Sequence, residues 1–369
     1  MIAFFRSLGR ALLLGLVRLI YRSSPGGSID ASKLKKVLVI RVDPRVGDVL
    51  LTTPLLRALR QGLPGARVDL LLAAGKEPLV EGLADRLIPF KKQDFFRHPR
   101  RFWRLIRSLK KEGYDAVIEA AHWHAFSFTS SWLTQATDAS IRIGHDRGLA
   151  AHFLTHAVVK DERNAREVPS KLELLGPLGL ATAGEEMETT VERGADVEPA
   201  LTALRALAGD RPWAAINVGA RKAECRWSPE GFGKLAARLD AELNLAPIIL
   251  WGPGEERLAE ATLVASGDRA KLAPPTKLAE LVAAFRHSAL AVANDTGPMH
   301  LAIATGAKVV AVLTLETGAR WIPAQSDHFQ GVGVDGVGDT SAEAIERVFQ
   351  ACAALVANST GRRDAMVDS

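Results

Sequence analysis

The chain has 369 residues, of which 47% are hydrophobic and 24% are charged, and its formal net charge is +5. This length accommodates two domains with substantial cores, and the composition excludes a disordered protein. Only two cysteines are present, Cys225 and Cys352, which argues against a disulfide scaffold and fits a reducing compartment. The positive charge favours anionic partners.

Residues 1–22 are rich in apolar side chains and are interrupted by arginines that lie four, eight and four positions apart, on one helical face. These arginines are Arg6, Arg10, Arg18 and Arg22. The uninterrupted apolar run at 11–17 is too short to span a bilayer, and no A-x-A cleavage site is present. We expect a basic amphipathic helix on an anionic membrane surface, with a linker that ends at residue 28; the alternative is a helix docked on the protein itself.

Near-continuous apolar runs alternate with helical patterns in the first half of the chain. The predicted strands are residues 37–42, 68–74, 114–119 and 141–144, and the first predicted helix is 47–61. Such strands, separated by helices, are typical of a parallel sheet that is covered on both faces. We assign residues 29–185 to a first α/β domain.

The pattern restarts after an acidic, alanine-rich connection that contains a predicted helix at 199–208. The next predicted strands are residues 213–218, 247–251, 289–293 and 308–313. The predicted helices are residues 228–243, 255–266, 278–287, 302–305 and 342–357. We assign residues 186–340 to a second α/β domain and residues 341–369 to a C-terminal helix with a tail that frays from residue 358.

Several common motifs are missing from the sequence. Neither half has G-x-G-x-x-G after its first strand, and neither G-x-x-x-x-G-K-[ST] nor G-x-S-x-G occurs, which disfavours nicotinamide and flavin enzymes. No Cys/His cluster has the spacing of a metal site. His122-Trp123-His124 comes nearest, and we interpret it as a loop at a strand end.

Asp48 closes the loop of residues 41–48 that follows the first predicted strand. In open α/β sheets ligands bind beyond the carboxyl ends of strands, where this carboxylate is expected to lie. Two interpretations fit: Asp48 caps the next helix, or it accepts a proton from an acceptor hydroxyl group.

The most informative stretch is Ala293-Asn294-Asp295-Thr296-Gly297-Pro298-Met299-His300-Leu301, which lies between two predicted strands. Asp295 or Thr296 is suited to cap a helix, Pro298 suits its first turn, and Gly297 lets a ligand approach the backbone. The free N–H groups of such a helix suit a phosphate. An ordinary, well-capped βαβ unit is the alternative.

Cations gather in the loop after the first strand of the second half. Arg221, Lys222 and Arg226 lie there, before a helix for which Ser228 is the expected cap and Pro229 the first residue. These cations either neutralise a diphosphate leaving group or are simply solvated. No D-x-D sequence occurs, so a divalent-metal clamp has no obvious ligands.

Three segments together resemble the lipopolysaccharide heptosyltransferases of glycosyltransferase family 9. They are Gly47-Asp48-Val49 with Thr52-Thr53-Pro54, Arg226-Trp227-Ser228-Pro229, and Asn294-Asp295-Thr296-Gly297-Pro298-Met299-His300. The resemblance covers about residues 36–350. It implies the α/β class and the GT-B fold, in which two Rossmann-like domains with parallel sheets face each other across a central cleft. It also implies inverting transfer without a metal or cofactor, from a nucleotide sugar, usually ADP-heptose, to a lipopolysaccharide core or similar glycan.

By this resemblance Asp48 is the catalytic base of an N-terminal acceptor domain, and the C-terminal domain binds the donor. The residues assigned to the donor are Asp295, Thr296, Gly297, His300, Arg226, Lys222, Gly252 and Glu255. Thr296 and Gly297 would lie at the diphosphate, and Gly252 and Glu255 in the segment that receives the nucleoside. His300 belongs to the same motif, or is a packed histidine of the first helical turn.

The sequence departs from the family pattern at two places, one in the donor site and one in the acceptor site. Cys225 stands where the family often has a lysine that neutralises phosphate, so Arg226, Lys222 or Arg221 would take that role. The first loop is one residue longer than usual, which indicates a different acceptor site. We expect the anionic acceptor to contact Arg41 and Arg45 here.

A predicted helix at residues 95–111 presents a basic face opposite an apolar one. The basic face comprises Arg97, Arg100, Arg101, Arg104, Arg107 and Lys111. Arg101 and Arg104 are expected to bind the anionic glycolipid acceptor; contact with the membrane surface and a plain solvated face are the alternatives. No aromatic interleaving accompanies the charge, so nucleic acid is not an expected partner.

The sequence thus predicts a metal-independent glycosyltransferase at the cytoplasmic face of the inner membrane, with peripheral membrane contact. Two alternatives stay open: another GT-B enzyme, such as a UDP- or GDP-sugar transferase or a nucleotide-sugar epimerase, and a non-catalytic nucleotide-sugar-binding protein. The residues indicate neither the acceptor sugar nor the oligomeric state.

Overall fold

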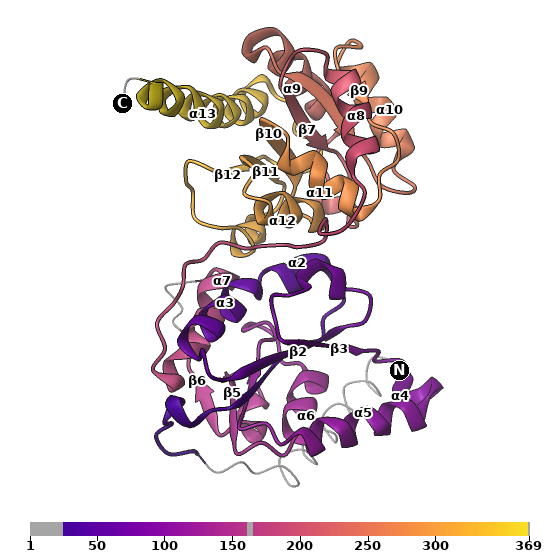
Figure 1. Ribbon diagram of the computed structural model, residues 1–369. Coiled ribbons are helices and arrows are strands. Elements are labelled where there is room, and N and C mark those ends of the chain that lie inside the picture. Colours follow the sequence, from indigo (N-terminus) through magenta and orange to yellow (C-terminus); the bar gives the residue numbers. More distant parts are fainter. Residues whose placement is uncertain (1–24, 161–164, 368–369) are drawn as a thin grey trace. The chain divides into compact units, whose positions relative to one another are not determined.

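The structure is a computed structural model that describes residues 25–160 and 165–367. It divides into two compact units, Met1–Glu186 and Met187–Ser369, and each is described by itself (Figure 1). The amphipathic helix expected within residues 1–22 lies outside the described residues. In the ranges that the structure describes, no helix combines the length and the apolar character needed to cross a membrane.

The first unit contains a six-stranded sheet in the order β3-β2-β1-β4-β5-β6, and every recorded pairing is parallel. Its strands are β1 (Lys36–Arg41), β2 (Arg67–Ala73), β3 (Arg86–Phe90), β4 (Ala116–Glu119), β5 (Ile141–His145) and β6 (His156–Val158). Its α-helices are α2 (Val46–Leu50), α3 (Thr53–Gly62), α4 (Asp94–Arg97), α5 (Pro99–Glu112), α6 (Phe128–Ala136) and α7 (Glu167–Leu172). Its 3₁₀ helices are η1 (Ala31–Lys33), η2 (Glu77–Val80), η3 (Ala150–Phe153) and η4 (Glu173–Leu178).

The second unit repeats this plan with a parallel six-stranded sheet in the order β12-β11-β10-β7-β8-β9. Its strands are β7 (Trp213–Asn217), β8 (Ala246–Leu250), β9 (Lys271–Leu272), β10 (Leu290–Asn294), β11 (Val309–Leu313) and β12 (Phe329–Gly333). Its α-helices are α8 (Glu198–Ala208), α9 (Pro229–Leu243), α10 (Glu256–Ala265), α11 (Leu278–Arg286), α12 (Gly297–Ala304) and α13 (Ala342–Val367). Its 3₁₀ helices are η5 (Ala223–Cys225) and η6 (Glu316–Arg320).

Each sheet has the strand order of a Rossmann fold, since numbering the strands of either unit from one to six gives 3-2-1-4-5-6. The predicted α/β class with parallel sheets is therefore confirmed. The order reverses between β1 and β4 in the first unit and between β7 and β10 in the second. At such a reversal the connections after the two central strands run in opposite directions, which leaves a crevice for a ligand.

The central strands are the ones that the apolar runs predict. Each residue of β7, β8, β10 and β11 is buried. The four strands without a prediction are β3, β6, β9 and β12, which form the edges of the two sheets. Edge strands are short and half-exposed here, so they lack a continuous apolar run.

The helices differ from the predictions mainly at prolines. The helix expected at 47–61 is divided into α2 and α3 just before Pro54, and the basic helix is divided into α4 and α5 at His98, before Pro99. A proline disfavours helical backbone in the residue that precedes it. The helix expected at 302–305 begins earlier, at Gly297. The tail expected to fray from 358 continues instead as α13 to Val367.

Gly233 on α9 lies directly against the end of α10. A Cβ atom added there would be 2.6 Å from the carbonyl carbon of Ala265 and 2.8 Å from the backbone nitrogen of Ser266. Backbone atoms cannot swing away as a side chain can, so this contact requires glycine.

We predict that Gly233→Ala destabilises the protein. The overlap should cost about 1–3 kcal/mol, which exceeds the gain in helix propensity of at most about 1 kcal/mol. Urea unfolding of the variant beside wild type measures the difference. Gly333→Ala in β12 is the control, since nothing lies within 4 Å of a Cβ there. Equal stability of Gly233→Ala and wild type would contradict the close packing of α9 on α10.

Candidate active site

Polar side chains gather at the carboxyl ends of the two central strands in each unit. In the first unit the loop after β1 leads to Asp48, and the residues after β4 lead to His122. In the second unit the loop after β7 carries the cations, and β10 leads into α12. Both sets lie at the position where the strand order reverses, which is where open α/β sheets bind ligands.

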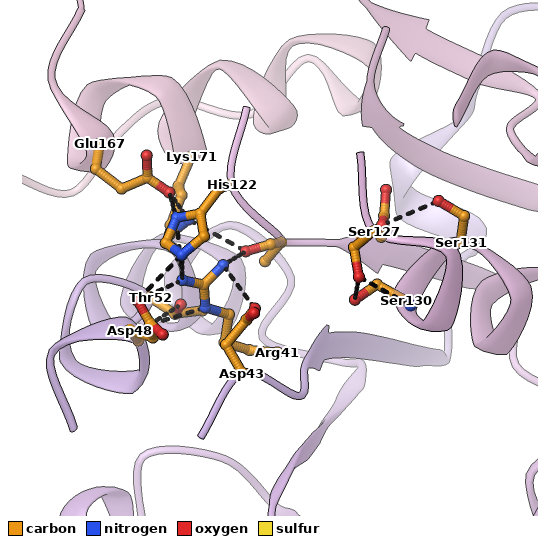
Figure 2. A network of polar contacts seen from close by, with 12 residues as sticks. Arg41, Asp43, Asp48, Thr52, His122, Ser127, Ser130, Ser131, Glu167 and Lys171 are labelled. Atoms are coloured by element: carbon orange, nitrogen blue, oxygen red, sulfur yellow. Dashed lines mark hydrogen bonds and ion pairs between the residues drawn. The ribbon is translucent and has the colours of Figure 1, made fainter. Parts of the chain in front are cut away.

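Asp48 lies in the first turn of α2 with its side chain turned to β1 and β4 (Figure 2). The Oδ1 atom of Asp48 is 3.0 Å from Nη2 of Arg41 and 3.1 Å from Nε2 of His122. The N-cap position of α2 is Arg45, so the interpretation of Asp48 as a helix cap is wrong. The residue is only 4% exposed, and its carboxylate is therefore held by charged partners rather than by water.

Arg41 holds both the side chain and the backbone of Asp48. Its Nε donates to the carbonyl oxygen of Asp48 at 3.0 Å, and its Nη1 donates to that of Ala120 at 2.9 Å. Its Nη1 also lies 3.3 Å from Oδ2 of Asp43. Because the guanidinium is completely buried, the expected contact of Arg41 with the acceptor needs correction: the group faces inward, toward Asp48.

His122 connects Asp48 to α7. Its Nδ1 lies 2.7 Å from Oε1 of Glu167, and the same oxygen lies 2.7 Å from Nζ of Lys171. Lys171 also donates to the carbonyl oxygen of Ala120 at 3.1 Å. Glu167 and Lys171 are buried. They therefore form the floor of the Asp48 site.

Sequence reasoning missed His122, Glu167 and Lys171 as site residues. His122 follows β4 in a loop, as predicted, but only the strand order shows that β4 neighbours β1. With that order, its place after the neighbouring central strand would have been a usable signal. Glu167 and Lys171 lie in a stretch without a recognisable motif.

The charges in this cluster shift one another's protonation. Burial raises the pKa of Asp48, but the hydrogen bond from His122 and the charges of Arg41 and Arg45 bring it down to about 2. Burial likewise opposes ionisation of Glu167, yet Lys171 and His122 keep its pKa well below the usual range. Burial and the charge of Arg41 lower the pKa of Lys171 to about 8. Both carboxylates are therefore ionised at neutral pH.

Two groupings of described residues have nitrogen and oxygen atoms close enough to surround a metal ion. They are Asp43, Asp48 and His122, and His122, His124 and Glu167. The guanidinium of Arg41 already contacts all three members of the first grouping, and Lys171 already pairs with Glu167 in the second. A divalent cation would meet a positive charge in either place, so neither grouping fits a metal.

Asn294 ties the cation loop of the second unit to the ends of β7 and β10. Its Oδ1 accepts from the backbone N–H of Trp227 at 2.8 Å, and its Nδ2 donates to the carbonyl oxygen of Val218 at 3.0 Å and of Gly219 at 3.4 Å. Asn294 and Trp227 are buried. The loop therefore approaches α12 because one amide satisfies three backbone groups.

The start of α12 is open to an anion. Thr296 occupies the N-cap position, but its hydroxyl group makes no capping hydrogen bond and instead donates to the carbonyl oxygen of Asn294 at 3.3 Å. The predicted side-chain cap by Asp295 or Thr296 is therefore wrong. Helical N–H groups without such a cap keep their affinity for a negative ligand. His300, one turn on, is buried, as the interpretation of a packed histidine requires.

Asp295 lies beside the same helix start and has an unusual charge environment. Burial raises the pKa of its carboxyl group to about 6, against the lowering effect of Lys222. Burial and Asp295 together raise the pKa of the Cys225 thiol. The thiol is therefore neutral, and Lys222 is the cation that acts on Asp295. That Lys222, Arg221 or Arg226 takes the phosphate-binding role of the family lysine stays a prediction.

Three other residues that are expected to bind the donor, Arg226, Gly252 and Glu255, lie near the end of β7. Arg226 is half-buried, and its Nε donates to the carbonyl oxygen of Ala220 at 2.6 Å. Glu255 accepts from the backbone N–H of Gly252 at 2.9 Å. A Cβ atom on Gly219 would lie 1.9 Å from Oε2 of Glu255. The carboxylate of Glu255 therefore rests on the backbone at the end of β7, next to the cation loop.

Ser228 caps α9 as predicted: its hydroxyl group accepts from the N–H of Gly231 at 3.1 Å, and Pro229 is the first residue of the helix.

The remaining acceptor candidates lie on the surface of the first unit. Arg45 is exposed at the start of α2, and Arg104 is exposed on α5. Arg101 is exposed too, and its Nε lies 3.4 Å from Oδ2 of Asp94. The opposite face of α5 is buried through Phe102, Ile106 and Leu109, so the predicted division of this helix into a basic and an apolar face is confirmed.

Comparison with known proteins identifies relatives of this chain. Residues 102–358 match glycosyltransferase family 9 (heptosyltransferase). Over 287 residues the chain is 26% identical to lipopolysaccharide heptosyltransferase 3 of Escherichia coli strain K12, which covers 75% of this chain and 82% of that protein. The glycosyl transferase family 9 structure from Veillonella parvula superposes with a TM-score of 0.73 at 20% identity and covers 90% of this chain and 99% of that one. The E. coli heptosyltransferase WaaC with ADP superposes with a TM-score of 0.65 at 20% identity, over 85% and 99% of the two chains.

The two Rossmann-like units and their likeness to these structures define a GT-B protein. Because the family match spans more than half of the sequence, the chain belongs to glycosyltransferase family 9 and is a glycosyltransferase. The membership predicted from three short segments is confirmed. The alternatives of an epimerase and of a non-catalytic binding protein are set aside.

We predict that Asn294→Ala loosens the cation loop and destabilises the second unit. The buried N–H of Trp227 would lose its acceptor, at a cost of about 1–3 kcal/mol. Urea unfolding and limited proteolysis at the loop of Arg221 and Lys222 measure the two effects. Asn358→Ala, at an exposed position of α13, is the matched control and should stay within about 0.5 kcal/mol of wild type. Intact stability in Asn294→Ala would show that the loop is held by other contacts.

Proposed function

We propose that this glycosyltransferase moves a heptose from ADP-heptose to a lipopolysaccharide core or a similar anionic glycan. The observation that carries the proposal is the ionised, buried carboxylate of Asp48 at the strand-order reversal of the first unit. An uncapped helix start in the second unit and the printed names of the relatives support it. A transferase that uses a different nucleotide sugar is the second candidate, because Cys225 replaces an expected phosphate-binding lysine.

In this mechanism Asp48 accepts the proton of the acceptor hydroxyl group. The oxygen then attacks the anomeric carbon from the side opposite the diphosphate, and the carbon–oxygen bond to the diphosphate breaks with inversion. The negative charge that develops on the leaving group is stabilised by the N–H groups at Thr296 and Gly297 and by Lys222 and Arg226. These groups supply fixed positive charge in place of a metal ion, so EDTA should not inhibit transfer.

The nucleoside end of the donor is assigned to the segment of Gly252 and Glu255. The carboxylate of Glu255 is half-buried and anchored to the N–H of Gly252, which leaves its other lone pairs for hydroxyl groups of a ribose. Asp295 and His300 complete the donor region, and Arg45 and Arg101 with Arg104 are proposed to contact the anionic acceptor.

A surface on α4 and α5 fits peripheral binding to an anionic membrane at the cytoplasmic face of the inner membrane. We call this the aromatic-basic surface. Its exposed aromatic side chains are Phe95, Phe96 and Trp103, which are 45%, 83% and 44% exposed. Its exposed cations are Arg97, Arg100, Arg101 and Arg104. Figure 1 shows α4 and α5 end to end on the first unit. The expectation that no aromatic side chains accompany the charge of this helix is therefore wrong. Aromatic rings beside arginines are typical of segments that enter the headgroup layer.

We predict that Asp48→Asn lowers kcat for heptosyl transfer by about 10²–10⁴-fold and leaves the affinity for the nucleotide unchanged. The amide cannot take up the proton, and the groups assigned to the diphosphate belong to the other unit of the chain. Transfer to a heptose-deficient core is followed by mass spectrometry, and binding by calorimetry. Asp146→Asn, an exposed carboxylate in the same unit, is the control.

The donor is tested by thermal shift with ADP, UDP, GDP and CMP, each with and without EDTA, because ligands of the native state raise Tm by mass action. A shift that is selective for ADP and insensitive to EDTA supports the proposed donor. Selectivity for another base overturns it in favour of the second candidate.

We predict that Phe96→Ser with Trp103→Ser weakens binding to vesicles that contain phosphatidylglycerol by about tenfold or more, since each ring loses about 1.5–3 kcal/mol of apolar burial. Sedimentation with vesicles measures this. Val264→Ser, which removes an apolar side chain that is 75% exposed on the second unit, is the control. Equal loss in both variants, or strong binding to neutral vesicles, would contradict a specific aromatic-basic surface.

A further inference from the structure

Two side chains hold the same oxygen atom of Asp48. Nη2 of Arg41, at the end of β1, lies 3.0 Å from Oδ1, and Nε2 of His122, in the loop after β4, lies 3.1 Å from it (Figure 2). The two nitrogen atoms are themselves 3.0 Å apart. Both groups are therefore directed at one acceptor atom.

The other carboxylate oxygen of Asp48 has a different environment. Oδ2 has no hydrogen bond to the residues that the structure describes, and it is not one of their fully buried polar atoms without a partner. It therefore reaches solvent, although the side chain as a whole is only 5% exposed. A ligand that approaches Asp48 meets Oδ2 rather than Oδ1.

Arg41 fixes Asp48 at both ends. Its Nε donates to the carbonyl oxygen of Asp48 at 3.0 Å, while its Nη2 contacts the carboxylate of the same residue. One planar guanidinium thus determines where the carboxylate lies relative to the backbone of α2. A lysine has a single ammonium group at the end of a flexible stem and could not replace these two contacts.

Glu167 and Lys171 orient His122 from its other side. Nδ1 of His122 lies 2.7 Å from Oε1 of Glu167, and Nζ of Lys171 lies 2.7 Å from the same oxygen. The carboxylates of Asp48 and Glu167 have pKa values below the usual range, so both are ionised and can only accept hydrogen bonds. Both ring nitrogens of His122 therefore donate, and neither has a lone pair with which to take a proton.

The charges of this cluster cancel when His122 carries both hydrogens. A buried cluster without net charge avoids the cost of an unpaired ion. Three carboxylates then meet three cations: Asp43, Asp48 and Glu167 on one side, and Arg41, Lys171 and His122 on the other. The cluster is thus suited to hold Asp48 in one orientation and not to take up a further proton.

We propose that Oδ2 of Asp48 is the atom that takes the proton of the acceptor hydroxyl group, and that Arg41 and His122 are positioning residues that keep Oδ1 out of the reaction. The inference rests on the proposed function. The O–H bond of the acceptor breaks, its proton passes to Oδ2, and its electron pair forms the bond from the acceptor oxygen to the anomeric carbon. The diphosphate leaves with the electron pair of the broken carbon–oxygen bond.

This arrangement places the base before the acceptor arrives. An aspartate side chain without such contacts rotates and presents either oxygen, so its ordering would have to accompany each reaction. Here the two contacts at Oδ1 order the carboxylate in advance, which leaves only the acceptor to be placed. Since Oδ2 reaches solvent, the proton can leave from this atom after transfer.

The charged groups around Asp48 determine how its protonation responds to a substitution. Burial raises the pKa of Asp48, and the hydrogen bond from His122 is the largest of the effects that lower it, followed by the charges of Arg41, His122 and Arg45. Removal of the His122 side chain should therefore raise the pKa of Asp48.

Other charged groups lie on the elements that pack around Asp48. Glu119, at the end of β4, pairs with Arg147 at 2.7 Å. Glu77, on the η2 helix that packs against α2, accepts from the N–H of Gly75 at 2.5 Å. The remaining neighbours are Asp43 in the loop after β1, His124 after His122, and Glu167 and Lys171 on α7.

The test compares His122→Ala with His122→Gln. A glutamine amide can still donate a hydrogen bond to Oδ1, whereas alanine cannot. His122→Ala should lower kcat by about 10²-fold, and His122→Gln should stay within about tenfold of wild type. The affinity for ADP, measured by calorimetry, should be unchanged in both. Equal loss of kcat in the two variants would overturn the inference, because an imidazole that accepts the proton would give that result.

The pH profile of kcat distinguishes positioning from a structural role. In His122→Ala the acid limb that reports Asp48 should lie at higher pH than in wild type, where the pKa of Asp48 is about 2. The shift should be smaller in His122→Gln, which keeps the hydrogen bond. A structural role alone would lower the stability to urea and leave the limb at its wild-type position, and this outcome would overturn the inference.

Arg41→Lys tests the second positioning residue. The ammonium group keeps the positive charge but cannot contact the carbonyl oxygen and the carboxylate of Asp48 together, so kcat should fall about tenfold or more. Wild-type kcat in this variant would refute the role of Arg41.

His124→Ala is the matched control, since its ring centroid lies 5.2 Å from that of His122. It should keep the wild-type kcat and acid limb. Loss of activity in this variant together with inhibition by EDTA would overturn the inference in favour of a metal ion.

A readout without turnover separates this inference from the proposed function. If wild type transfers no heptose, the proposed function fails, but ¹³C NMR still follows the carboxyl carbon of Asp48, assigned by its absence in Asp48→Asn. As the pH is lowered, this carbon should begin to titrate at higher pH in His122→Ala than in His122→Gln or wild type. The same titration in all three proteins would refute the contact between His122 and Asp48 on which the inference depends.

Discussion

The first unit depends on the buried ion pair between Arg41 and Asp48. A guanidinium without solvent contact is tolerated only where its donors are satisfied. Here they meet the carboxylate and the carbonyl oxygen of Asp48, the carbonyl oxygen of Ala120, and Asp43. The pair therefore ties β1, α2 and the end of β4 together, and the carboxylate that we propose as the base is part of what keeps these elements in place.

The second unit has an uncharged side chain, not an ion pair, at the corresponding place. At its strand-order reversal, Asn294 joins the ends of β7 and β10 to the cation loop through three hydrogen bonds. A neutral amide adds no charge beside an open helix start, so the positive potential there is left for an anion. The two units thus share a strand order and differ at the reversal, where the first has a buried ion pair and the second a neutral amide beside an open helix start.

One departure from the family pattern, Cys225, lies on the donor side. Cys225 is neutral and offers no positive charge, and Asp295 lies close enough to Lys222 for the two to influence each other. With a pKa of about 6, Asp295 becomes neutral as the pH falls through that value, and its repulsion of a nearby anion then disappears. The donor region that we propose for this chain therefore has its cations, Lys222 among them, in the loop after β7 and no lysine at position 225.

The sequence by itself determined the central strands, the α/β class, the cap of α9, the family and the place of Asp48 in the loop beyond the first strand. These follow from local patterns, because apolar runs, caps and short motifs involve neighbouring residues. The tertiary structure alone decided that Arg41 faces inward, that α12 starts without a side-chain cap, and that His122, Glu167 and Lys171 surround Asp48. The reason is that β1 and β4 are neighbours, with α7 close to them, only because of the strand order of the sheet. The packing of the whole sheet sets this order, and no local stretch of sequence contains it.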